Sequence, residues 1–131
     1  MSCRLDALNT ILNKSLSKSK FNEYCDEFDK EMNFEIGTSR EYFIVGKNMQ
    51  NIFSYILKHH DGAESFYIPM SNDSFNILNK KLEENSNLTK LIVFNKGHAW
   101  AMLKHKDRWY KNLKKKHVKK IPKDCGYVII Y

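Results

Sequence analysis

The spacing of the apolar side chains changes halfway along this chain, and that change constrains the fold more than any other feature. In the first half, apolar residues recur every three or four positions, the period of an amphipathic helix. The clearest stretch contains Phe21, Tyr24, Cys25, Phe28 and Met32. In the second half, short apolar runs alternate with turn residues, a pattern typical of strands. Helices first and antiparallel strands later predict an α+β domain with one helical layer on one sheet.

The same patterns give approximate boundaries for the elements. We expect helices around Leu5–Leu12, at 21–32, and at 73–84, with a further helix that follows an N-cap at Asn48 and ends near Gly62. Strands are expected at 65–68, 88–94, 99–104, 108–113 and 127–131. Residues 15–20 are expected to connect two helices. No repeat or linker divides the chain, so residues 1–131 are predicted to form a single domain.

Composition narrows the class of protein further. A hydrophobic content of 42% supports a real core, and no apolar run approaches the length of a membrane span. The three cysteines are an odd number without CxxC spacing, which disfavours a disulfide framework or a structural zinc site. We therefore expect a cytoplasmic, reducing compartment, no membrane partner, no cofactor and no metal. Cys25 and Cys125 lie in apolar patterns and are expected in the core.

The net charge of +7 is concentrated near the C-terminus. Seven lysines lie in the segment Lys111–Lys123, and Asp26, Glu27 and Glu31 belong to an opposing acidic stretch. A lysine run of this kind is either a solvated loop or edge, or a surface that attracts nucleic acid or an acidic protein. The sequence leaves both readings open.

Two residues far apart in the chain suggest a chemistry. Cys3 falls in the first turn of the first expected helix, and His98 follows Gly97 at the start of an expected strand. A helix N-terminus and a nearby imidazolium both favour the thiolate form of a cysteine, which is the nucleophilic form. If the sheet faces the first helix, the two residues form a Cys/His pair for nucleophilic catalysis. Taken singly, a cysteine in this position is usually an ordinary thiol, and a histidine in such a strand is more often structural than catalytic.

The order of these motifs resembles a known family. The stretch Cys-Arg-Leu-Asp-Ala-Leu-Asn-Thr-Ile-Leu from Cys3 is similar to the nucleophile helix of Josephin-type deubiquitinases, Cys-x-x-His-x-Leu-Asn-x-Leu-Leu. The Gly-His-Ala-Trp motif at 97–100, with Trp-Tyr at 109–110, resembles their catalytic-histidine hairpin. Residues 48–57 with the strand that follows, and the ending 126–131, resemble their middle helix and closing strand. The Gly-His-Ala form and the Trp-Tyr pair also resemble viral papain-like leader proteases.

This resemblance implies a papain-like cysteine protease fold with Cys3 as nucleophile and His98 as general base and acid. The family's third catalytic residue lies four positions after the tryptophan, where this chain has Leu113, so Asn112 is the candidate only if a bulge shifts the strand. The family's oxyanion-hole glutamine precedes the nucleophile by several residues, whereas two residues precede Cys3 here. Either backbone N–H groups serve the oxyanion, or the glutamine belongs to a longer chain.

The leading hypothesis is therefore a thiol-dependent deubiquitinase, with ubiquitin or a ubiquitin-like protein as partner. Trp100 and the acidic residues Asp26, Glu27 and Glu31 are candidate substrate contacts. Two alternatives remain: a viral leader-type protease that cleaves a polyprotein, and an inactive module that binds RNA or an acidic protein through Lys111–Lys123.

Overall fold

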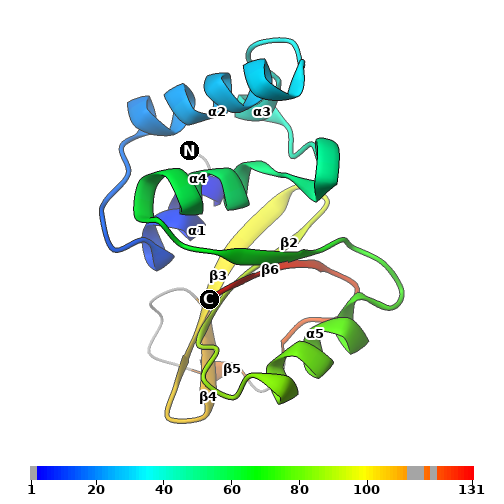
Figure 1. Cartoon of the computed structure of the whole chain (residues 1–131). Coiled ribbons are helices and arrows are strands. Elements are labelled where there is room, and N and C mark those ends of the chain that lie inside the picture. The colour runs from blue at the N-terminus through cyan, green and yellow to red at the C-terminus, as the bar shows by residue number, and fades with distance from the viewer. Residues whose placement is uncertain (1–2, 112–116, 119–120) are drawn as a thin grey trace.

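The computed structural model describes residues 3–111, 117–118 and 121–131 of the chain. Figure 1 shows an antiparallel sheet with several helices gathered on one face and a single helix on the other. The helical elements are α1 (Cys3–Ile11), α2 (Lys18–Met32), α3 (Thr38–Glu41), the 3₁₀ turn η1 (Lys47–Met49), α4 (Ile52–Asp61) and α5 (Ser74–Glu84). The strands are β1 (Ser65–Ile68), β2 (Lys90–Asn95), β3 (His98–His105), β4 (Arg108–Lys111), β5 (His117–Val118) and β6 (Gly126–Ile130).

The strands form one six-stranded sheet in the order β1-β6-β2-β3-β4-β5, and each neighbouring pair is antiparallel. The last strand, β6, is inserted between β1 and β2, where its five residues are all buried. The α+β class and the antiparallel sheet agree with the sequence prediction.

Side chains alternate between the two faces of the sheet along each strand, and each face is buried in a core of its own. On one face, Ile92, Phe94, Ala99, Ala101 and Val128 pack against α1, α2 and α4 in the first core. On the other face, Leu91, Val93, Trp100, Met102 and Tyr127 form the second core with Leu78 of α5. The prediction of a single helical layer was therefore incomplete. The apolar stripe of α5 shows that one side of this helix is buried, but it carries no information about which face of the sheet it covers.

Two helix starts differ from the sequence prediction. The helix α2 begins at Lys18, inside the expected connection 15–20, because the side chain of Ser17 caps it by accepting a hydrogen bond from the backbone N–H of Lys20. The helix α4 is capped by Asn51, whose side chain accepts from the N–H of Ser54 at 3.1 Å. Asn48 instead adopts a left-handed backbone with φ 56° in η1. The expected C-terminal signal at Gly62 is confirmed by its left-handed conformation, φ 66°.

The second half of the chain follows the predicted strand pattern closely, with one addition. The short strand β5 lies inside the lysine-rich segment that was expected to be a loop. Cys25 and Cys125 are buried, as predicted. Within the described ranges, no helix has the length and apolarity needed to cross a membrane.

Candidate functional site

The first helix carries Cys3 to one end of the sheet. Ala7, Leu8 and Ile11 of α1 are buried in the first core, and α1 packs mainly against β3. The facing side chains of β3 are Ala99 and Ala101, which are small and therefore let the helix approach the sheet closely. As a result, Cys3 in the first turn of α1 lies partly exposed beside the start of β3.

A pocket of about 780 Å³ opens at this end of the sheet, and we call it the Cys3 pocket. Cys3 and His98 both line it, although 94 residues separate them in sequence. The other described lining residues come from the start of α2, the segment after α3, the turn between β2 and β3, and neighbouring core positions. They are Arg4, Lys18, Phe21, Asn22, Arg40, Glu41, Tyr42, Phe43, Phe53, Met70, Phe94, Asn95, Lys96, Gly97 and Ala99.

The imidazole of His98 forms no hydrogen bond with the sulfur of Cys3 in this structure. His98 has the same strand parity as Trp100, on the α5 face, and its ring stacks on the indole with centroids 5.2 Å apart. Cys3 packs against the first core on the opposite face. Both side chains belong to the described part of the chain, and no hydrogen bond joins them. The two side chains thus line one pocket, but the ring of His98 stacks on Trp100 and is not hydrogen-bonded to Cys3.

The three cysteines have different surroundings. Burial raises the pKa of Cys25 to about 12, and burial together with the nearby Asp124 carboxylate raises the pKa of Cys125. A buried thiol with a raised pKa is a poor nucleophile at neutral pH. Cys3 is the one cysteine that is partly exposed, and it is the one that lines the pocket.

Arg4 ties the start of α1 to the segment that follows α3. Its guanidinium donates hydrogen bonds to the backbone carbonyls of Ser39 at 2.7 Å, Arg40 at 2.5 Å and Tyr42 at 3.4 Å. Burial lowers the pKa of Arg4, while the nearby sulfurs of Cys25 and Cys3 oppose that effect. Since a guanidinium stays charged in proteins, Arg4 places a fixed positive charge near Cys3.

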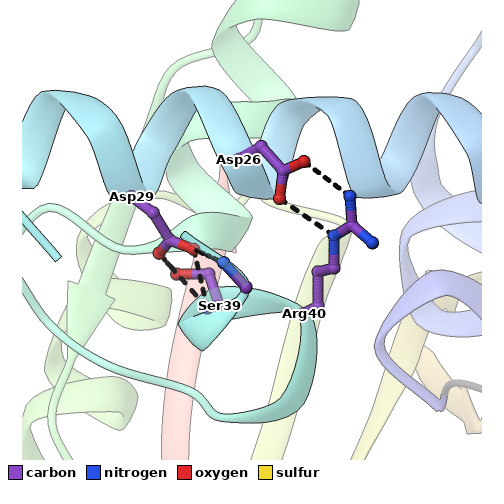
Figure 2. A network of polar contacts seen from close by, with 5 residues as sticks. Asp26, Asp29, Ser39 and Arg40 are labelled. Atoms are coloured by element: carbon purple, nitrogen blue, oxygen red, sulfur yellow. Dashed lines mark hydrogen bonds and ion pairs between the residues drawn. The ribbon is translucent and has the colours of Figure 1, made fainter. Parts of the chain in front are cut away.

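A buried carboxylate orders α3, which forms part of the pocket wall. Asp29 of α2 is fully buried and accepts hydrogen bonds from the N–H of Gly37 at 3.0 Å, the N–H of Ser39, and the Ser39 hydroxyl at 2.6 Å. Three positions earlier on α2, Asp26 forms a two-pronged ion pair with the guanidinium of Arg40. Figure 2 shows both contacts, which hold α3 against the side of α2.

The predicted substrate contacts do not line the Cys3 pocket. Asp26 is engaged by Arg40. Glu27 and Glu31 line a separate pocket with Lys30, Tyr55 and His59, and the Tyr55 hydroxyl donates to Glu31 at 3.4 Å. Trp100 is buried in the second core with 8% of its surface exposed, because it faces α5. None of these four residues is therefore among the described lining residues of the Cys3 pocket, and their role as substrate contacts stays a prediction.

The third catalytic candidate, Asn112, lies outside the described residues, as does most of the lysine-rich segment. Among the residues that are described, no group of three or more His, Cys, Asp or Glu side chains is placed to hold a metal ion.

Several pocket residues were missed by sequence reasoning. Arg4 is adjacent to Cys3, but its acceptors are backbone carbonyls at least 35 residues away and leave no trace in a sequence pattern. The aromatic floor formed by Phe43 and Phe94 is reflected only in the apolar character of their segments. Lys18 and Lys96 are exposed lysines that only the fold brings to one pocket.

Comparison with known proteins found no relative of this chain. No family model matches it, and no curated protein or solved structure is detectably similar to it. The functional argument therefore depends on the Cys3 pocket and on the chemistry of the residues that line it.

Proposed function

We propose that this chain is a papain-like, Josephin-like cysteine peptidase that hydrolyses ubiquitin or ubiquitin-like conjugates at Cys3. The observation that carries the proposal is the shared pocket: the one partly exposed cysteine, at a helix N-terminus, lines it together with a histidine from the β2–β3 hairpin. The guanidinium of Arg4 places a positive charge at the same end of α1, where it can attract the negative charge that develops during the reaction.

In the proposed reaction, the Cys3 thiolate attacks the carbonyl carbon of the scissile amide and forms a tetrahedral oxyanion. Backbone N–H groups at the start of α1 stabilise this oxyanion. The intermediate collapses when protonated His98 donates its proton to the leaving amine, which leaves a thioester on Cys3. Water then attacks the thioester while His98 accepts a proton, and the carboxylate product departs as the thiolate is regenerated.

The proposal requires the imidazole of His98 to turn from the face of Trp100 toward Cys3. His98 is exposed and is the first residue of β3, directly after Gly97, whose φ of 127° marks a sharp turn. Catalytic contacts in free enzymes are often long and become shorter only when substrate binds. We therefore expect substrate to draw the ring from its stacked position into the pocket.

The direct test is labelling by a ubiquitin probe that carries a C-terminal electrophile. The wild-type chain is expected to form a covalent adduct, and Cys3→Ala is expected to abolish it. Cys25→Ala and Cys125→Ala are matched controls that should keep labelling, because both thiols are buried. Adduct formation by Cys3→Ala would refute Cys3 as the nucleophile, and a complete lack of adduct with wild type would refute the proposed substrate.

The role of His98 is tested in the same assay. His98→Ala is expected to slow labelling by at least about 100-fold, the typical contribution of a positioned acid or base. His105→Ala removes an exposed histidine from the far end of β3 and is the matched control. Equal labelling rates for the two variants would remove His98 from the mechanism.

A further inference from the structure

The Cys3 pocket is distinctly basic along its described lining. Four basic side chains face it, from Arg4, Lys18, Arg40 and Lys96, against the single carboxylate of Glu41. These charges come from α1, α2, α3 and the β2–β3 turn, so the fold gathers them from four separate parts of the chain. A cleft lined by one sign of charge attracts ligands of the opposite sign.

The four basic side chains are not equally available to a ligand. Arg40 is neutralised by its ion pair with Asp26. Arg4 keeps its charge, but both terminal nitrogens of its guanidinium already donate to backbone carbonyls. Lys18 and Lys96 are exposed, and neither forms an ion pair within the part of the chain that the structure describes. These two ammonium groups are therefore the ones that an anionic ligand can reach.

The pocket also has an apolar floor and rim. The ring of Phe43 packs on Phe94 at 4.7 Å and on Phe53 at 5.4 Å between centroids. At the rim, Tyr42 and Met70 leave 62% and 40% of their surfaces exposed. The pocket thus offers apolar contact as well as exposed positive charges, and a small anion would use only the charges.

We infer that the Cys3 pocket binds an extended peptide segment in which acidic side chains flank an apolar one. The inference rests on the proposed function, since this segment is then the part of the substrate next to the scissile bond. It deepens that function by specifying the modifier: a ubiquitin-like protein with an acidic tail is favoured over ubiquitin, whose basic tail would meet Lys18 and Lys96 with like charge.

Binding of labelled peptides tests this inference without any need for catalysis. The full chain carrying Cys3→Ala is titrated with three fluorescein-labelled decapeptides that are identical except at two positions, which carry Glu, Gln or Arg. Fluorescence anisotropy at low salt gives each Kd. We expect the Glu peptide to bind at least about tenfold more tightly than the Arg peptide, with the Gln peptide between them.

Charge reversal then locates the effect. When Lys18→Glu and Lys96→Glu are both added to the Cys3→Ala chain, we expect the order of the three binding affinities to be reversed. The matched control adds Lys14→Glu and Lys80→Glu, which change the net charge equally at exposed positions outside the pocket lining. The control should keep the original order.

The inference would be overturned if all three peptides bound with equal affinity, or if both double variants changed the order of affinities equally. It would also be overturned if a single-stranded oligonucleotide displaced the labelled Glu peptide at a lower concentration than the unlabelled Glu peptide does. Loss of the peptide order while Cys3 still reacts with the ubiquitin probe refutes only this inference. An intact order in a chain whose Cys3 reacts neither with the ubiquitin probe nor with the same probe carrying an acidic tail refutes only the proposed peptidase activity.

Discussion

Asp29 illustrates how much one buried residue can contribute to the shape of the site. Its carboxylate is removed from water and satisfied by donors from Gly37 and Ser39, at the start of α3. Hydrogen bonds to a charged group contribute more than neutral ones, and a buried group left without its partners costs further free energy. The part of the pocket wall that α3 and the following residues form therefore depends on Asp29, which does not itself line the pocket.

We predict that Asp29→Asn lowers the free energy of unfolding by about 2–4 kcal/mol. The amide keeps the shape of the carboxylate, but it directs an NH₂ group at donors from Gly37 and Ser39. Asp26→Asn is the matched control on the same helix, and it should cost below about 1 kcal/mol because the Asp26–Arg40 ion pair is partly exposed. Urea denaturation of both variants measures the difference, and equal losses would contradict the assigned role of Asp29.

At the scale of elements, helix ends depend on single capping side chains. The sequence offers two asparagines before α4, and the structure uses Asn51, which is fully buried and also donates to the carbonyl of Met49 at 3.3 Å. Asn48 instead takes a left-handed backbone conformation, which asparagine tolerates better than most residues. Both positions satisfy the local preference for a cap, so the choice is made by the packing of Ile52 and Phe53 into the first core.

We expect Asn51→Ala to destabilise the protein by about 1–2 kcal/mol, because it removes the acceptor for the N–H of Ser54. Asn51→Ser should recover part of this loss, since serine is also a good N-cap. Asn48→Gly should change stability by only a few tenths of a kcal/mol, because glycine adopts positive φ readily. Thermal unfolding of the three variants tests the assignment, and a larger loss at Asn48 would reverse it.

Periodicity predicted the principal helices and strands of this chain because each of them buries one face or both. It did not predict that α5 covers the second face of the sheet, or that β5 extends the sheet beyond β4. Those features depend on contacts between distant segments. The order of elements did lead us to expect Cys3 and His98 at one place, and the pocket contains both. The sequence pattern did not reveal that the ring of His98 stacks on Trp100, because that depends on the orientation of the side chain. It also did not reveal the ion pair between Asp26 and Arg40, which lie 14 positions apart.

For the whole molecule, two cores enclose the sheet and bury several groups that ionise at alkaline pH. Burial raises the pKa of Cys25 and of Tyr127 to about 12. It also raises that of Tyr55 to about 12, with Glu31 as a further cause. Cys25 and Tyr55 belong to the first core and Tyr127 to the second, so both sides of the sheet contribute. Each of these groups is expected to hold its proton in the folded chain at a pH where the unfolded chain has lost it.

We therefore predict that stability falls as the pH rises above about 9. Between the ordinary pKa of a thiol and about 12, the unfolded chain binds fewer protons than the folded chain, so the free energy of unfolding decreases with pH. Each such group contributes up to about 1.4 kcal/mol per pH unit within its window. From pH 9 to 10 the two buried thiols, Cys25 and Cys125, contribute most, because the tyrosines begin to contribute only near pH 10. Urea denaturation should thus show that wild type loses about 1 kcal/mol more than Cys25→Ala over this interval, whereas equal losses would show that Cys25 is not the group responsible.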